Sequence, residues 1–257
     1  MRLLSILASP RPESVSATIV DAFLSEYRQR KTDLVIDTLN VWMESLPEFD
    51  AEAIGAKYKG VSGAPMTAAE QKTWESIEHL ASRFQNADRL VLGVPMWNFS
   101  YPYKLKQLID LSCQRNLLFT FDGKAYGPSL KIDKALVVYV RGQSEEAGIS
   151  DLDSPGFTYL SGYIDFWLRF IGVQDVVTLT VEHTWDGRAV DTIETARIRA
   201  AELASWRTRS DRAPAASQAR RTVERPRLCR SVPRARTARS CAQATLQDCN
   251  FASITIT

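Results

Sequence analysis

The sequence predicts a doubly wound α/β domain, in which five parallel strands carry helices on both faces. Five nearly uninterrupted apolar runs alternate along the chain with amphipathic segments long enough to form helices. Strands that are apolar on both sides are typical of a parallel sheet covered by two helical layers, because both of its faces are buried. All six tryptophans precede residue 207, so we expect this domain to span residues 1–206.

The predicted elements follow one another in regular alternation. Strands are predicted over residues 2–9, 33–39, 89–97, 134–142 and 175–183. Helices are predicted over residues 16–31, 67–88, 103–115, 157–172 and 189–206. The second helix has the clearest start, because Thr67 and Glu70 have the spacing of a capping box. Gly172 ends the fourth helix, and residues 40–66 are predicted to be irregular.

Residues 207–257 differ in composition from the rest of the chain. They contain eleven arginines, no lysine, three acidic residues and three of the four cysteines. Such a basic segment could bind the phosphates of a nucleic acid or a membrane surface. However, it lacks helical or strand periodicity, and no aromatic side chains interleave with the arginines as stacking platforms for bases. We therefore prefer a disordered tail to a nucleic-acid-binding arm, and its cysteine spacing predicts no metal site.

The remaining composition is typical of a globular protein of the cytoplasm. No apolar run reaches the ~18 residues of a membrane-spanning helix, and the first apolar run is too short for a secretory signal. Cys113 is the only cysteine within residues 1–206, which is typical of a reducing compartment. We expect this cysteine to be a small core residue.

Ligands of open parallel sheets bind beyond the carboxyl ends of the strands. Three of the predicted strands lead into SPRPESVS at 9–16, PMWNFSYP at 95–102 and RGQSEEAG at 141–148. The first segment is rich in hydroxyls and opens a helix, whose N-terminal amides favour an anion, so it suits a phosphate group. Ser14 or Ser16 could instead only cap that helix, and both interpretations stay open.

The second segment places Met96, Trp97, Asn98 and Phe99 directly after a buried strand. Apolar planes beside an amide suit an aromatic ligand with polar edges. The alternative is that the three apolar side chains are core or interface residues. Asn98 counts against that alternative, because a buried amide must find hydrogen-bond partners.

SPRPESVS and PMWNFSYPYKLKQLID together resemble the FMN-dependent azoreductases and NAD(P)H quinone oxidoreductases of the flavodoxin-like class, and the resemblance covers residues 2–205. It implies a homodimer with one FMN at each of two interface sites. It assigns the FMN phosphate to Ser9, Ser14, Val15 and Ser16, the isoalloxazine ring to Met96, Trp97, Asn98 and Phe99, and a third flavin segment to Val140, Arg141, Gly142 and Gln143. The family usually has Ser-Arg-Gly-Gly in this third segment, so Val140 and Gln143 depart from the pattern. Backbone N–H groups could still hold the pyrimidine edge of the flavin.

The activity implied by the resemblance is a ping-pong transfer of two electrons. NADH or NADPH would pass a hydride to flavin N5, and a quinone or an aromatic azo dye would then take both electrons. No side chain acts as a nucleophile in this scheme, and no metal is needed. An aromatic substrate pocket, partly from the partner subunit, is expected from Phe121, Tyr126 and Trp167. Glu182 and His183 are further candidates for the substrate pocket, because they follow the last predicted strand at the carboxyl end of the sheet, where Glu182 could orient the second substrate. For Trp167, packing within its helix is the alternative.

Two other classes of function remain to be compared. An electron-transfer flavodoxin would share the fold and the FMN but would serve a protein partner. Such carriers are small and strongly acidic, whereas residues 1–206 are only mildly acidic and residues 40–66 resemble extra walls of a substrate pocket. The enzyme is therefore preferred to the carrier, and both are preferred to a nucleic-acid-binding protein acting through its tail.

Overall fold

The computed structural model describes residues 1–144, 147, 156–206 and 253–256. Its main sheet is parallel, with the strand order β2-β1-β3-β6-β7-β8. These strands are β1 (Arg2–Leu7), β2 (Val35–Asn40), β3 (Arg89–Pro95), β6 (Ile132–Val140), β7 (Val173–Val181) and β8 (Ser253–Ile256). The first five have the doubly wound order of flavodoxin-like sheets, which confirms the predicted five-stranded parallel sheet.

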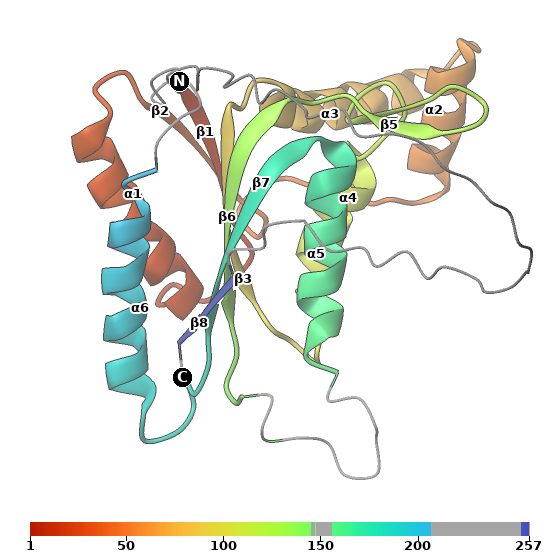
Figure 1. Ribbon diagram of the computed structural model, residues 1–257. Coiled ribbons are helices and arrows are strands. Elements are labelled where there is room, and N and C mark those ends of the chain that lie inside the picture. The colour runs from red at the N-terminus through yellow and green to blue at the C-terminus, as the bar shows by residue number, and fades with distance from the viewer. Residues whose placement is uncertain (145–146, 148–155, 207–252, 257) are drawn as a thin grey trace, which may run out of the picture. The chain divides into compact units, whose positions relative to one another are not determined.

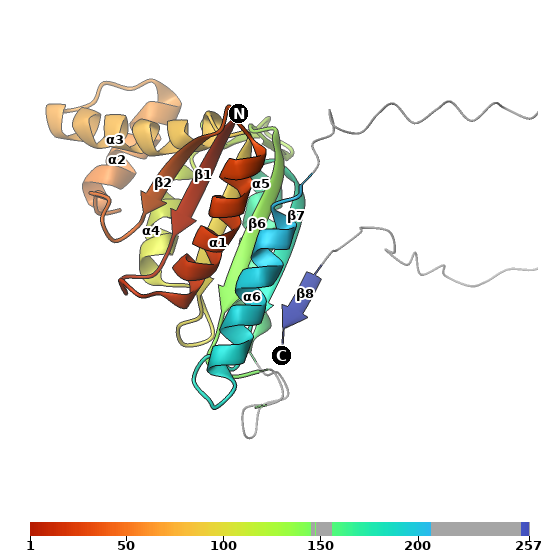
Figure 2. The same ribbon diagram turned by 90° about the vertical axis from the view of Figure 1, so that its left-hand side faces the viewer.

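Helices cover both faces of this sheet (Figures 1 and 2). They are α1 (Val15–Arg30), α3 (Ala68–Gln85), α4 (Tyr103–Ser112), α5 (Thr158–Ile171) and α6 (Ala189–Leu203). Helices α1 and α6 bury one apolar core against the sheet, and α3, α4 and α5 bury a second core on the opposite face. The predicted capping box is confirmed, because the Thr67 and Glu70 side chains each bind the backbone N–H of the other residue.

The prediction of irregular structure over residues 40–66 is wrong for α2 (Ala51–Ser62). Asp50 caps this helix by accepting two backbone N–H groups, and Gly63 ends it with a φ of 70°. Only Ala53 and Ala56 of α2 are buried, so the helix has no apolar stripe for sequence reasoning to find.

Helix α2 is stabilised instead by close packing against α3. A Cβ atom on Gly60 would lie 2.8 Å from the Trp74 ring, so the glycine permits the approach of the two helices. Lys59 and Glu70 form an ion pair of 2.6 Å across the same contact. The Lys59 ammonium and the Thr67 backbone N–H, which both donate to the Glu70 carboxylate, lower the pKa of that carboxyl.

Three further strands were not predicted. An antiparallel hairpin joins β4 (Phe119–Phe121) to β5 (Tyr126–Pro128). Strand β8 adds a sixth strand beside β7, with Thr178 opposite Ser253. Apart from β8, the predicted disordered tail over 207–257 lies outside the described residues. Strand β8 belongs to the same compact unit as the described residues of 1–206.

No helix in the described part of the chain has both the length and the hydropathy that a bilayer span requires.

The carboxyl ends of β1, β3, β6 and β7 lie together at one edge of the sheet, the lower edge in Figure 1. Gly93 of β3 brings the first turn of α1 to this edge. A Cβ atom at Gly93 would lie 3.2 Å from the Ser16 carbonyl oxygen, so a larger residue would require the helix to shift slightly away from the strand.

Candidate functional site

A cavity of about 320 Å³ lies at this edge of the sheet. Four chain segments contribute to it, one after each of β1, β3, β6 and β7. The residues that line it are Ser9, Arg11, Ser14, Val15, Ser16, Pro95, Met96, Trp97, Val140, Arg141, Gly142, Thr184 and Trp185. Nine of the twelve residues that the sequence assigned to a cofactor are thus brought together.

The first wall of the cavity is formed by hydroxyl groups at the start of α1. Ser14 is the N-cap, and its Oγ accepts the Ala17 N–H at 3.4 Å. The same Oγ lies 2.9 Å from Ser16 Oγ, while Ser9 Oγ accepts the Arg11 N–H at 3.3 Å. The first turn of α1 contains no acidic residue. Hydroxyls, N-terminal amides and the Arg11 guanidinium together suit an anion.

The second wall follows β3. The backbone of Trp97 and Ser100 exchanges two hydrogen bonds, of 2.7 and 2.9 Å, around a two-residue turn. Asn98 and Phe99 occupy that turn with φ values of 47° and 64°, as a type I′ turn requires. A positive φ is costly for a residue as bulky as phenylalanine, so tertiary contacts must hold the turn. Asn98 and Phe99 are exposed and do not line the cavity, whereas Met96 and Trp97 do.

The third wall follows β6 and contains a buried ion pair. Arg141 Nε donates to Glu182 Oε1 at 2.8 Å, and a second guanidinium nitrogen donates to the same oxygen. Only 8% of the Arg141 side chain and 3% of the Glu182 side chain are exposed. The guanidinium also lies 4.7 Å from the centre of the Phe157 ring. Glu182 thus compensates the charge of Arg141 and fixes its position beside the cavity.

Gly142 completes this wall and packs closely against Trp185. A Cβ atom there would lie 2.6 Å from the indole of Trp185, which is itself largely exposed. Gln143 is exposed and is not among the lining residues. Val140, the other departure from the family pattern, uses its carbonyl to accept the Met96 N–H at 2.8 Å.

The fourth wall contains two residues that sequence reasoning missed, Thr184 and Trp185. His183 before them has a φ of 57°, which turns the chain at the end of β7. Its buried ring lies 2.9 Å from Asp186 Oδ2, outside the cavity lining. Thr184 Oγ1 donates to the Arg141 carbonyl at 3.0 Å. Ligands bind beyond the carboxyl ends of parallel strands, and this rule applies to β7 as it does to β1, β3 and β6. It could therefore have indicated Thr184 and Trp185 from the sequence.

The aromatic residues predicted for the substrate pocket lie apart from the cavity. Phe121 and Tyr126 are on the β4–β5 hairpin, with ring centres 4.7 Å apart, and Figure 1 shows this hairpin at the other end of the sheet. Trp167 is 2% exposed and packs edge-on against Phe84 in the core. Trp167 is therefore a core residue of this chain, in agreement with the alternative that it packs within its helix layer.

A smaller cavity of about 150 Å³ adjoins the first and shares Met96, Val140 and Arg141 with it. It extends between the sheet and α5, where the Tyr139 hydroxyl donates to Asp165 Oδ1 at 2.8 Å. Burial raises the pKa values of both groups.

Cys113 does not supply a reactive thiolate to either cavity. Burial raises the pKa of its thiol to about 11, so the group is protonated at neutral pH. The side chain packs against the core beside α4, which agrees with the role expected of it.

The chain matches a family described by its flavodoxin-like fold over residues 1–206. It is 61% identical to FMN-dependent NADH:quinone oxidoreductase 2 of Burkholderia lata over 206 residues, which cover 80% of this chain and 99% of that relative. It is 40% identical to FMN-dependent NADH:quinone oxidoreductase 3 of Pseudomonas fluorescens over 205 residues, 79% of this chain and 94% of the other.

Solved structures share the fold. A FMN-dependent NADH-azoreductase of Bacillus anthracis, in complex with FMN, aligns with a TM-score of 0.70 at 24% identity, covering 79% of this chain and 97% of its own. A further azoreductase structure from Bacillus anthracis aligns with a TM-score of 0.71 at 22% identity, covering 79% and 98%.

Proposed function

The chain belongs to the flavodoxin-like family of the FMN-dependent NADH:quinone oxidoreductases, and from this membership we propose what its cavity binds and does. The protein is an FMN-dependent oxidoreductase that passes two electrons from NADH or NADPH to quinones and aromatic azo compounds. Its relatives carry the cofactor and the donor in their names, and a structural neighbour is described in complex with FMN.

One observation about this chain carries the proposal: the hydroxyl-lined start of α1 and the side chains of Met96 and Trp97 line the same cavity. FMN combines a phosphate with a planar ring system whose edges are polar. Ser9, Ser14 and Ser16 offer donors to the phosphate, while Met96 and Trp97 offer apolar surface to the ring. The cavity volume, about 320 Å³, lies within the range of small-molecule sites. The residues present therefore fit the cofactor.

The site residues divide into three groups by the part of FMN that each would hold. Of the residues that the resemblance suggested, Ser9, Ser14, Val15 and Ser16 would hold the phosphate, Met96 and Trp97 the ring, and Val140, Arg141 and Gly142 the pyrimidine edge. Asn98, Phe99 and Gln143 are exposed outside the lining and are left out of this assignment. When bound, FMN supplies hydride acceptance and two-electron transfer. The protein orients the ring, and the ion pair of Arg141 with Glu182 keeps that wall rigid and electrically balanced.

We also propose that the active form is a cytoplasmic homodimer with the two FMN sites at its interface. Tyr126 on the β4–β5 hairpin is exposed, and the tilted ring of Phe121 packs against it, away from the cavity of its own chain. In a dimer these rings could line the substrate pocket of the partner, as the family resemblance implies. Glu182 would then contribute by fixing the position of Arg141, and His183 by turning the chain after β7.

The first test is the absorption spectrum of the purified protein, followed by identification of the molecule released on heating. Flavin absorption with FMN released is expected, and a colourless protein that takes up no added FMN contradicts the proposal. Steady NADH oxidation with menadione or methyl red, without a partner reductase, distinguishes the enzyme from an electron carrier. Binding of FMN but not riboflavin should be weakened by Ser16→Ala, with Ser76→Ala on α3 as the control.

A further inference from the structure

Trp42 lies in the turn after β2, half-buried between two of the segments that line the cavity. Its indole Nε1 donates to the Ala8 carbonyl oxygen at 3.0 Å. Ala8 directly precedes Ser9, the first hydroxyl of the phosphate-binding segment. The indole therefore holds the loop between β1 and α1 through its backbone.

The same indole contacts the segment after β3. Its ring centre lies 5.7 Å from that of Trp97, and 5.2 Å from that of Tyr103 at the start of α4. Trp97 lines the cavity, whereas Trp42 does not. The Trp42 side chain thus contacts both the hydroxyl wall and the aromatic wall without lining the cavity itself.

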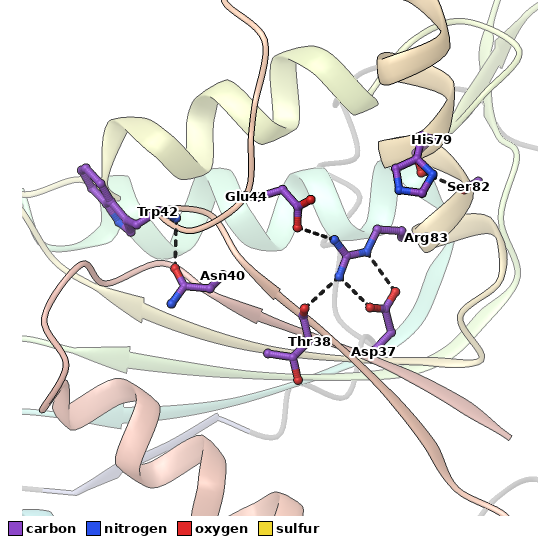
Figure 3. A network of polar contacts seen from close by, with 8 residues as sticks. All are labelled: Asp37, Thr38, Asn40, Trp42, Glu44, His79, Ser82 and Arg83. Atoms are coloured by element: carbon purple, nitrogen blue, oxygen red, sulfur yellow. Dashed lines mark hydrogen bonds and ion pairs between the residues drawn. The ribbon is translucent and has the colours of Figure 1, made fainter.

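The turn that carries Trp42 is anchored at its far side by Arg83 of α3 (Figure 3). The Arg83 guanidinium donates to both Asp37 carboxylate oxygens, at 2.6 and 2.9 Å, and to Glu44 Oε2 at 2.7 Å. Asp37 belongs to β2 and Glu44 follows Trp42 by two residues, so the ion pairs close the turn on both sides. The Trp42 N–H also donates to Asn40 Oδ1 at 3.0 Å.

We propose that Trp42 is a positioning residue for bound FMN, because it fixes the hydroxyl wall and the aromatic wall of the cavity relative to each other. The inference rests on the proposed function, since it assumes that one FMN spans both walls. It assigns Trp42 no contact with the cofactor. Loss of its N–H donor should loosen the two walls together.

The test compares Trp42→Phe with Trp74→Phe. Both variants delete one indole N–H hydrogen bond, but Trp74 Nε1 donates at 2.8 Å to Glu78, one turn further along α3, and neither residue lines the cavity. We expect Trp42→Phe to bind FMN about two- to ten-fold more weakly, the loss expected for one hydrogen bond. The visible circular dichroism of bound FMN should also change. Trp74→Phe should leave both measurements unchanged.

Hydrogen exchange of the FMN-free protein supplies a second measurement. Peptides over 8–16 and 96–100 should both exchange faster in Trp42→Phe than in the parent and the control. Unchanged affinity and dichroism in Trp42→Phe would overturn the inference. If the parent binds no FMN, the proposed function fails; the exchange data then still decide whether Trp42 couples the two walls, and equal exchange in all three proteins refutes the coupling.

Discussion

Replacing Arg141 by methionine removes the partner of a carboxylate that is almost fully buried. Glu182 is 3% exposed and accepts two guanidinium N–H groups through Oε1. Deleting one member of such a pair costs about 3–5 kcal/mol, because the other charge stays buried. For a domain of this size each 1 kcal/mol lowers the unfolding midpoint by about 2–4 °C. We therefore expect Arg141→Met to lower the midpoint by about 6–20 °C.

The matched control is Arg197→Met on α6. Arg197 pairs with Glu194 at 2.7 Å, but their side chains are 47% and 57% exposed. Such a surface pair contributes about 0–1 kcal/mol, so its loss should shift the midpoint by only a few degrees. Thermal unfolding followed by circular dichroism on FMN-free protein measures both. Equal midpoints for the two variants would refute the electrostatic reasoning.

Removing both members of the pair gives this prediction a second signature. The double variant Arg141→Met/Glu182→Leu, which buries no charge at either position, should recover most of the lost stability.

Three other perturbations test the fold and its titrating groups. Gly172→Ala should lower the unfolding midpoint by more than about 6 °C or prevent folding, because φ is 114° and the new Cβ would lie 2.1 Å from the Leu130 carbonyl oxygen. Its control is Gly162→Ala in α5, which should be neutral or stabilising because nothing lies within 4 Å of the new Cβ. Similar unfolding midpoints for the two variants would contradict the geometry. Burial raises the pKa of Asp165 above 3.8, so its ionisation destabilises the fold as pH rises through the raised pKa. The midpoint of Asp165→Asn relative to the parent should therefore increase from pH 4 to pH 7, and a constant difference argues against the shift. Because burial raises the pKa of Cys113 to about 11, iodoacetamide at pH 7.5 should alkylate it about 100- to 1000-fold more slowly than free cysteine. Peptide mass spectrometry measures this rate, and a rate equal to that of free cysteine would contradict the raised pKa.

Local sequence signals predict the strands well because the sheet is buried on both faces. Every residue from Leu90 to Val94 is buried and apolar, so β3 appears in the sequence as a continuous apolar run. Helix α2 could not be recognised in the same way. Its stability comes from glycine contacts and an ion pair with α3, and such tertiary contacts leave no periodic pattern in the sequence. Its caps, Asp50 and Gly63, were the only local signals.

The candidate site was predictable as far as strand ends determine it. The segments after β1, β3 and β6 supply most of the lining, as the topology requires. What the sequence could not give was the direction of each side chain within its loop. The positive φ values of Asn98 and Phe99 turn them out of the cavity, and that of His183 brings Thr184 and Trp185 to it. Non-glycine residues with positive φ are too rare to predict from composition.

The two interpretations of Ser14, helix cap and phosphate ligand, are compatible when its hydrogen bonds are counted. A hydroxyl has one proton to donate and two lone pairs to accept with. The cap uses one lone pair, because Ser14 Oγ accepts the Ala17 N–H. The contact of 2.9 Å with Ser16 Oγ uses one proton of the two hydroxyls, whichever residue donates it. The other proton can still be directed at an anion, and so the cap orients the pair of serines rather than competing with a phosphate for them.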